Sequence, residues 1–222
     1  MKEGGNVTLA ENAHHYLRNV LRVEVGQSLR LFNGQDGEFV ARVSNIGKKA
    51  IDATIEKQLR AQQNQVRAIH LLFAPLKKER MDFLIEKAVE LGATHLHPVL
   101  TQNSDVRKIN EDRIHAQIIE AAEQCERLDL PLLSPAKELF AALAPWDKNI
   151  PVLTALERCN APPMNKTMAQ GDVAILIGPA GGFSPEEMEK LPAMSFVRPV
   201  SLGGNILRAE TAALTALGIL AV

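Results

Sequence analysis

Two glycine turns near the end of the chain constrain its fold more than any other feature. Each turn follows an apolar run and precedes a helix-favouring segment: Leu-Ile-Gly-Pro-Ala-Gly-Gly-Phe-Ser-Pro-Glu-Glu at residues 176–187, and Leu-Gly-Gly-Asn-Ile-Leu-Arg-Ala-Glu-Thr-Ala at residues 202–212. Ligands of open α/β sheets bind where strands end, and glycine lets the backbone approach a ligand closely. Two such turns close together predict one backbone-lined site for a flat, polar small molecule such as a nucleoside cofactor.

The first turn carries the signals of a helix start. Ser184 suits the N-cap, Pro185 the first helical position and Glu187 the glutamate of a capping box. Taken alone, this pattern is equally compatible with a strand-to-helix turn that binds nothing. It is not a phosphate-binding P-loop, because no Gly-Lys-Ser/Thr follows, and it lacks the GxGxxG spacing of dinucleotide sites.

Arg208 and Glu210 are charged residues in an otherwise apolar segment after the second turn. Burying charge is costly unless it is paired, so this pair needs a physical reason. In one interpretation the two residues cap each other or bond to the backbone. In the other, Arg208 holds a phosphate or polarises a substrate carbonyl.

The composition indicates an ordinary soluble protein with one large domain or two small ones. The chain has 222 residues, of which 46% are hydrophobic and 23% charged. No apolar run is long enough to span a membrane and the start does not resemble a signal peptide, so we expect a cytoplasmic protein. Cys125 and Cys159 lie far apart in unlike contexts, which favours reduced thiols. No His/Cys/Asp cluster has metal-ligand spacing, and we expect no metal.

Charge is distributed unevenly along the chain. Residues 1–80 carry 13 Lys/Arg against 8 Asp/Glu, whereas residues 81–222 carry 12 against 18. A basic module joined to an acidic remainder suits a protein that faces a polyanion, although ordinary surface variation also explains an excess of this size.

The N-terminal part is predicted to be a small antiparallel β-barrel. A short helix at residues 12–20, with Asn12 as its N-cap, precedes it. Apolar residues then alternate between residues 23 and 55, and Asn-Gly and Asp-Gly pairs punctuate them. The polar stretch 57–66 places the domain boundary, which gives domains 1–63 and 64–222.

From residue 69 onward the pattern becomes α/β, with strands predicted at residues 69–74, 96–100, 151–156, 173–177 and 196–202. The helical stripes between them are Met81, Leu84, Ile85, Ala88 and Val89, followed by Ile114, Ile118, Ala121, Ala122 and Cys125. Such alternation predicts a mostly parallel sheet covered on both faces. The nearly apolar last helix, from Ala209 to about Leu220, should be buried.

The paired turn motifs resemble those of the ribosomal small-subunit RNA (uracil-N3) methyltransferases of the SPOUT superfamily. Residues 14–22 followed by Val25-Gly26 are similar to the start of the PUA-like RNA-binding barrel of that family. Residues 77–92 resemble its first catalytic-domain helix, and residues 120–125 with Arg127 resemble a further segment. The resemblance covers nearly the whole chain, and its motifs together are highly specific.

The resemblance implies a SPOUT-type parallel sheet with a C-terminal trefoil knot, preceded by a PUA-like β-barrel. It implies that S-adenosyl-L-methionine binds in the knot and that N3 of a uridine in 16S ribosomal RNA is methylated, more naturally within the assembled small subunit than on free RNA. The residues expected to line the cofactor pocket are Leu153, Thr154, Ile177, Gly178, Gly181, Gly182, Leu202, Gly203, Ile206, Leu207 and Thr211.

Arg208 and Glu210 are the expected catalytic residues. N3 of uracil carries a proton, which must leave before or during methyl transfer. Either Arg208 stabilises the uracil anion, or Glu210 or a bound water takes the proton. A homodimer is also expected, because the resemblance implies that knotted domains pair through the last helix and its apolar surface needs a partner.

The expected RNA-binding residues are Arg18, Arg22, Arg30 and Arg42 on the barrel and Lys77, Lys78 and Arg80 past a strand end. A positioning surface needs spread charge, which favours the barrel arginines as phosphate ligands. For the second cluster, a solvated loop is an equally good interpretation. His14 and His15 are expected on a helix surface or facing RNA, because neither lies near the knot in sequence.

The chain departs from the family at three places. The family usually has glutamate where this chain has Ala180, and proline-arginine or similar where it has Gly204-Asn205. Its members usually begin with a basic strand before Val7, which we expect to be missing or shortened here. Two alternatives therefore stay open: a methyltransferase with another RNA target, such as a ribose 2′-hydroxyl, or an RNA-binding protein that keeps the fold with little turnover.

Overall fold

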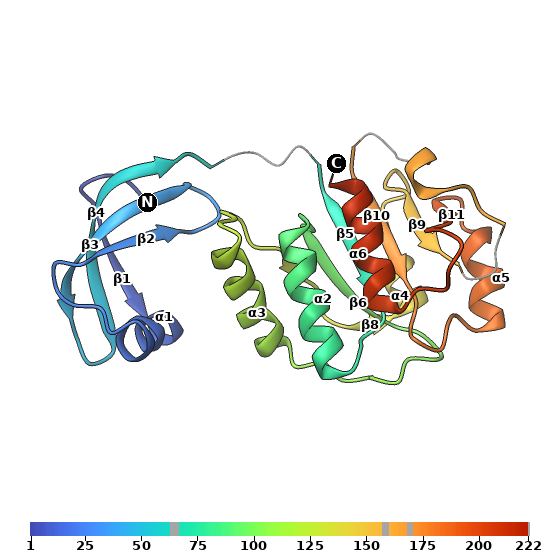
Figure 1. Cartoon of the computed structure of the whole chain (residues 1–222), viewed down its shortest axis with the longest axis horizontal. Helices are drawn as coiled ribbons and strands as arrows, with labels where there is room; N and C mark the ends of the chain where they lie inside the picture. The colour runs from blue at the N-terminus through green and yellow to red at the C-terminus, as the bar shows by residue number, and fades with distance from the viewer. Residues whose placement is uncertain (63–66, 157–159, 168–170, 222) are drawn as a thin grey trace. The chain divides into compact units, whose positions relative to one another are not determined.

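The computed structural model describes residues 1–62, 67–156, 160–167 and 171–221. By internal contacts the chain divides into two compact units, Met1–Asn64 and Gln65–Val222, which Figure 1 shows as a β-rich part and an α/β part.

The N-terminal unit is a four-stranded antiparallel sheet in the order β1-β4-β3-β2. Its strands are β1 (Asn6–Ala10), β2 (Ser28–Phe32), β3 (Glu38–Ile46) and β4 (Ala50–Arg60). The predicted antiparallel strands are confirmed, and the ladder that the described residues form runs from β1 to β2 without closing on itself. Two small apolar clusters hold the unit together, one around Val43 and Ile51 and the other around Phe39 and Ile55.

Two features of this unit differ from the predictions. The first helix, α1 (Glu11–His15), begins at Glu11, so Asn12 lies inside it and is not its N-cap. A π-helical turn, η1 (Tyr16–Val20), continues it. β4 extends to Arg60 by pairing with β3, so the start of the polar stretch 57–66 belongs to a strand. β1 begins at Asn6 and pairs with β4, which does not test the expectation that a strand before Val7 is missing or shortened.

The C-terminal unit is built on a sheet in the order β11-β9-β10-β5-β6-β7, with β8 paired to β6. Its strands are β5 (Ile69–Phe73), β6 (His95–Leu100), β7 (Leu132–Leu133), β8 (Lys137–Glu138), β9 (Val152–Ala155), β10 (Val173–Ile177) and β11 (Val197–Val200). Every strand pair is parallel, as predicted. All residues of β10 are buried, which is typical of a central strand covered on both faces.

Helices cover both faces of this sheet. α2 (Lys78–Glu90), α3 (Glu111–Gln124) and α6 (Ala209–Leu220) lie over one face (Figure 1). α4 (Leu139–Leu143) and α5 (Pro185–Ala193) pack on the other through Leu139, Leu143 and Leu191. A short 3₁₀ helix, η2 (Met164–Lys166), lies between β9 and β10. The strands β7 and β8, with α4 and η2, are too short for periodicity to predict.

The predicted helix faces are confirmed. The buried residues of α2 are the five of its predicted stripe, and Gly92, with a φ of 87°, follows the helix end. Cys125 ends α3 as a half-buried free thiol, whereas Cys159 lies outside the described residues. α6 is buried as predicted, but against α2 and β10 of its own chain. Its apolar composition therefore does not by itself require a partner chain.

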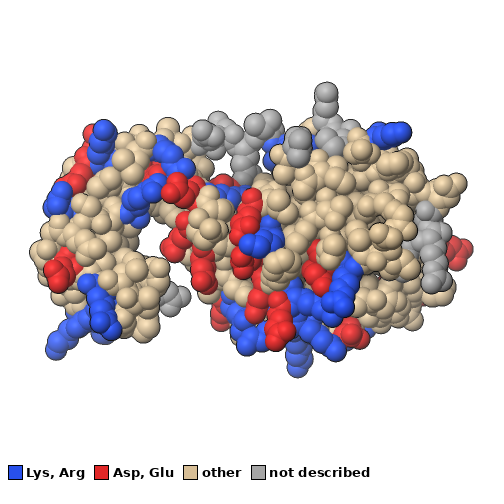
Figure 2. All heavy atoms as spheres, in the orientation of Figure 1, with Lys and Arg blue, Asp and Glu red and all other residues tan. Residues whose placement is uncertain are grey.

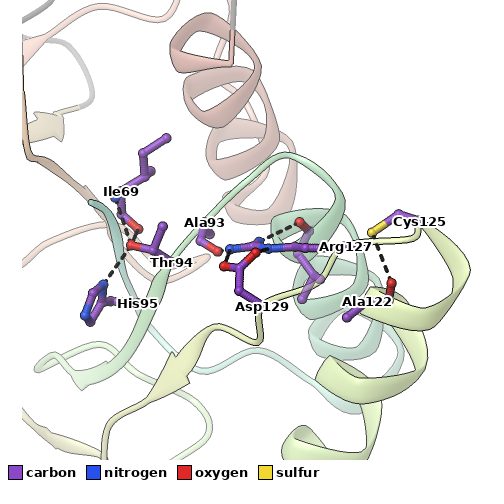
Figure 3. A network of polar contacts seen from close by, with 9 residues as sticks. Ile69, Ala93, Thr94, His95, Ala122, Cys125, Arg127 and Asp129 are labelled. Atoms are coloured by element: carbon purple, nitrogen blue, oxygen red, sulfur yellow. Dashed lines mark hydrogen bonds and ion pairs between the residues drawn. The ribbon is translucent and has the colours of Figure 1, made fainter. Parts of the chain in front are cut away.

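Arg127 ties the segment after α3 to the end of α2 (Figure 3). Its Nη1 donates hydrogen bonds to the carbonyl oxygens of Val89 at 2.9 Å and Ala93 at 2.7 Å. Its Nε and Nη2 bond both carboxylate oxygens of Asp129. An arginine suits this position because its planar fork of donors serves both carbonyls and both carboxylate oxygens of Asp129 at once.

Candidate functional site

The two glycine turns and the end of β9 enclose a cavity at one edge of the parallel sheet. β11, β9 and β10 are neighbours and run in the same direction, so the loops that follow them meet at their carboxyl ends. The cavity has a volume of about 650 Å³, which lies within the range of small-molecule sites. Its lining comprises Arg80, Ala155, Leu156, residues 177–183, Met188, residues 200–209 and Ala212.

The first turn is held in place by Glu187. The predicted capping box is confirmed: Ser184 Oγ accepts from the backbone N–H of Glu187, whose carboxylate accepts from the backbone N–H of Ser184. The same buried carboxylate accepts from the backbone N–H of Gln102 at 2.9 Å, and Asn103 Nδ2 donates to the carbonyl of Gly182 at 3.1 Å. The loop after β6 therefore braces this cavity wall, a role that sequence reasoning missed.

The second turn is anchored to the segment before η2. Ser201 forms a parallel bridge with Pro163, and its carbonyl accepts from the backbone N–H of Met164 at 3.0 Å. Gly203 follows with a φ of +127°, a conformation that residues with a side chain rarely adopt. The glycine at this position is therefore required by the backbone, independently of any ligand.

The structure brings most of the predicted cofactor residues together. Those that line the cavity are Ile177, Gly178, Gly181, Gly182, Leu202, Gly203, Ile206 and Leu207. Leu153 and Thr154 are fully buried within β9 and do not line it, and Thr211 is exposed on α6 outside the lining. Because β9 runs toward the cavity, its last residue, Ala155, and the residue after it, Leu156, reach the lining instead.

Ala180 and Asn205, where the resemblance implies a glutamate and an arginine, both line this cavity. Neither residue carries a charge. The carboxylate and the guanidinium expected from the family are therefore missing from the cavity wall itself.

The two predicted catalytic residues occupy different environments. Arg208 is an exposed residue that lines the cavity and makes no ion pair or hydrogen bond through its side chain with any described residue. Glu210 is 9% exposed and lies outside the lining. Its Oε1 lies 3.7 Å from Nε of Arg80, so its partner is Arg80 and not Arg208 as one interpretation held. Arg80, predicted to contact RNA from a surface cluster, lines the cavity.

The other predicted RNA-binding residues lie on exposed surfaces with different partners. Arg30 pairs with Glu38, and this bond is the main reason that the pKa of Glu38 lies below its usual range. Arg42 pairs with Glu56, and Arg18 donates to the carbonyl of Gly47. Arg22, Lys77 and Lys78 are exposed. Figure 2 shows Lys and Arg side chains gathered where α2 begins, with acidic side chains among them.

The histidines predicted to face RNA or solvent lie in the N-terminal unit. His14 is half-buried and its Nε2 lies 3.2 Å from the carbonyl oxygen of Gly47, whereas His15 is exposed.

A second cavity, of about 330 Å³, lies beside three stacked histidines that sequence reasoning missed. His70 on β5 stacks on His95 and His97 of β6, and its Nδ1 lies 3.0 Å from His97 Nε2. Burial, reinforced by the neighbouring histidines, lowers the pKa of His70 and of His97 from 6.5 to about 4. Strand order places these residues together, which no local pattern reveals.

Within the described part of the chain, no group of three or more His, Cys, Asp or Glu residues is arranged to hold a metal ion. In the same residues, no helix is both long and apolar enough to cross a membrane.

Comparison with known proteins identifies the family. The RNA methyltransferase PUA domain matches residues 9–56, and the RNA methyltransferase domain matches residues 62–221. A ribosomal RNA small subunit methyltransferase E of Rickettsia conorii is 35% identical, over 98% of this chain and 90% of its own length.

Several solved structures match almost the whole chain, among them two with S-adenosyl methionine bound. One, from Legionella pneumophila, was determined in complex with bound SAM; it is 32% identical with a TM-score of 0.87 and covers 99% of this chain and 93% of the other. The other, a ribosomal RNA small subunit methyltransferase E of Neisseria gonorrhoeae bound to S-adenosyl methionine, is 28% identical with a TM-score of 0.86, and the coverage is 99% and 92%. The chain therefore belongs to the ribosomal RNA small subunit methyltransferase E family.

Proposed function

We propose that this protein transfers a methyl group from S-adenosyl-L-methionine to N3 of a uridine in 16S ribosomal RNA. The observation that carries the proposal is the cavity at the strand ends, whose walls are the two glycine turns of the family. Family membership supports the reaction class, and the PUA domain in the N-terminal unit supports an RNA substrate.

The cavity fits the cofactor in size and in chemistry. Its backbone-rich walls offer N–H and C=O groups to a nucleoside, and Ile177, Leu202 and Leu207 offer apolar contact to an adenine ring. Gly182 and Gly203, both with positive φ, keep side chains out of the turns. S-adenosyl-L-methionine would supply an electrophilic methyl group on a sulfonium, so the protein needs no further electrophile.

Arg208 is the residue we assign to stabilising charge on the target base. Removal of the N3 proton leaves negative charge on the uracil ring and its carbonyl oxygens, which a guanidinium binds well. Arg208 lines the cavity at the N-cap of α6, where the helix dipole adds positive potential. Glu210 lies outside the lining, which favours a positioning role over proton abstraction.

The proposal includes substrate form and assembly. The target is the RNA of the small ribosomal subunit in the cytoplasm, with Lys77, Lys78 and the exposed arginines of the N-terminal unit binding phosphates. The resemblance to the family implies a trefoil knot and a homodimer, and we include both in the proposal for this chain.

The test is incubation of the full chain with labelled cofactor and small subunits that lack the modification. We expect label in 16S RNA that co-migrates with 3-methyluridine after digestion to nucleosides. Label on a ribose 2′-hydroxyl, or no transfer by folded protein that binds S-adenosylhomocysteine, would refute the assignment.

A further inference from the structure

We propose that Arg80 and Arg208 form an anion-binding wall of the cavity, that Glu210 positions Arg80 within it, and that Arg80 binds a backbone phosphate of the RNA substrate beside the base whose charge Arg208 stabilises. The inference rests on the proposed function, which it deepens. Arg80 thereby belongs to the site and not to a separate surface cluster. Glu210 orients the Arg80 side chain and does not act on the base.

The placement of Arg80 follows from the strand order. β5 lies next to β10 in the sheet, so the connection from β5 to α2 opens at the same edge as the two glycine turns. Arg80 lies in the first turn of α2 and lines the cavity from that side. Arg208, at the N-cap of α6, lines the same cavity from the second turn.

Both guanidinium groups retain their hydrogen-bonding capacity. Neither side chain donates a hydrogen bond to a described residue, and the ion pair of Arg80 with Glu210, at 3.7 Å, is longer than a hydrogen bond. An arginine carries N–H donors in a planar fork that matches phosphate and carboxylate oxygens. Two such groups on one cavity wall can bind an anionic ligand through hydrogen bonds and charge.

Glu210 fixes the direction of Arg80. Its side chain is 11% exposed against 45% for Arg80, and the shortest contact between them runs from Oε1 to Nε. The terminal nitrogens of Arg80 therefore remain for a ligand. Glu210 Oε2 is buried and has no hydrogen-bond partner within the described residues. A buried carboxylate in this state is costly unless a nearby cation compensates it, which ties Glu210 to Arg80.

Exposure and neighbours favour RNA phosphate over the carboxylate of the cofactor. Arg80 and Arg208 are exposed, so an anion that approaches from solvent reaches them first. The exposed Lys77 and Lys78 precede Arg80 in sequence, and Figure 2 shows basic side chains gathered in the region where α2 begins. A polyanion that follows this surface into the cavity would place a phosphate beside the base that reacts.

The test separates RNA binding from cofactor binding on the full chain. Variants Arg80→Ala, Arg80→Lys, Arg208→Ala and Glu210→Gln are compared with Arg198→Ala, an exposed arginine of β11 outside the lining. Affinity for S-adenosylhomocysteine is measured by calorimetry. Affinity for undermodified small subunits is measured across a series of salt concentrations, and methyl transfer is followed as kcat and KM.

Arg80→Ala should weaken subunit binding by ~10-fold or more and lower the slope of log K against log salt by ~0.7–0.9, the loss of one phosphate contact, whereas Arg208→Ala should mainly lower kcat. Binding of S-adenosylhomocysteine should stay within about 2-fold. Arg80→Lys should restore the salt slope with part of the affinity, and Glu210→Gln should raise KM more than it lowers kcat, because it misplaces Arg80 without removing its charge.

Two outcomes would overturn the inference. An equal loss of S-adenosylhomocysteine affinity would assign the site to the cofactor carboxylate. If Arg80→Ala had the same subunit affinity and salt slope as Arg198→Ala, Arg80 would not bind an anion of the substrate. Absence of methyl transfer by the wild type would instead refute the proposed function, and the salt series would still decide whether Arg80 binds RNA phosphate.

Discussion

Replacement of Arg127 by alanine should destabilise the C-terminal unit by ~3 kcal/mol. The side chain bonds the carbonyls of Val89 and Ala93 and pairs with Asp129 while only 11% exposed (Figure 3). A hydrogen bond from a charged donor contributes roughly 1.5–3 kcal/mol, and the two carbonyls would lose their guanidinium donor. Because these contributions are not additive, we count the free energy of one charged hydrogen bond for the two carbonyls together. The rest of the ~3 kcal/mol is assigned to the ion pair with Asp129.

The assay is urea unfolding followed by fluorescence of Trp146, the single tryptophan of the chain, which lies in the C-terminal unit and therefore reports on it. A loss of ~3 kcal/mol corresponds to a Tm lower by roughly 6–12 °C for a domain of this size. The matched control is Arg113→Ala, which removes an ion pair with Asp82 that is 42% and 29% exposed and should cost less than ~1 kcal/mol.

Arg127→Lys should fall between the two, because a point charge cannot reproduce the fork that reaches both the carbonyls and Asp129. A loss in Arg127→Ala no larger than that in Arg113→Ala would refute the reasoning and show that the clamp seen in the structure contributes nothing to stability.

Three further predictions concern pH, backbone strain and the brace of the first turn. The pKa of His70 and of His97 is about 4 in the folded chain and 6.5 unfolded; only the unfolded state binds protons between these values. The free energy of unfolding should therefore be highest above pH 6.5 and fall by ~2–4 kcal/mol as the pH drops toward 4, a figure already discounted for the partial exposure of both rings. Urea unfolding followed by circular dichroism measures it, and an unfolding free energy that does not change with pH would contradict the prediction. Gly203→Ala should cost ~1–3 kcal/mol and weaken S-adenosylhomocysteine binding in calorimetry, whereas Gly204→Ala, with equal room for a methyl group and no positive φ, should change little; equal effects would exclude strain as the cause. Glu187→Ala leaves two backbone N–H groups without their acceptor and should lower the unfolding free energy by ~2–4 kcal/mol. The control Glu186→Ala, at the exposed neighbouring glutamate, should cost under ~0.5 kcal/mol.

Local structure followed closely from the sequence. The buried stripe of α2, the bounds of β10 and α6, and the capping box at Ser184 match the predicted residues. These features depend on side-chain periodicity and on backbone preferences within a few residues, so a single segment contains all the information they need. The capping of α1 was predicted wrongly because the helix begins one residue earlier, and helix ends are where local signals are weakest.

The composition of the site required the tertiary structure. The turn motifs by themselves indicated a backbone-lined pocket, and the residues of both turns do line one cavity. Arg80 lines the cavity because β5 lies beside β10 in the sheet. The loop after β6 reaches Glu187 because β6 is the next strand after β5, and the stacked histidines meet because β5 and β6 are neighbours. Strand order is a choice among long-range pairings that local propensity does not encode, so only the folded sheet decided which side chains share a wall.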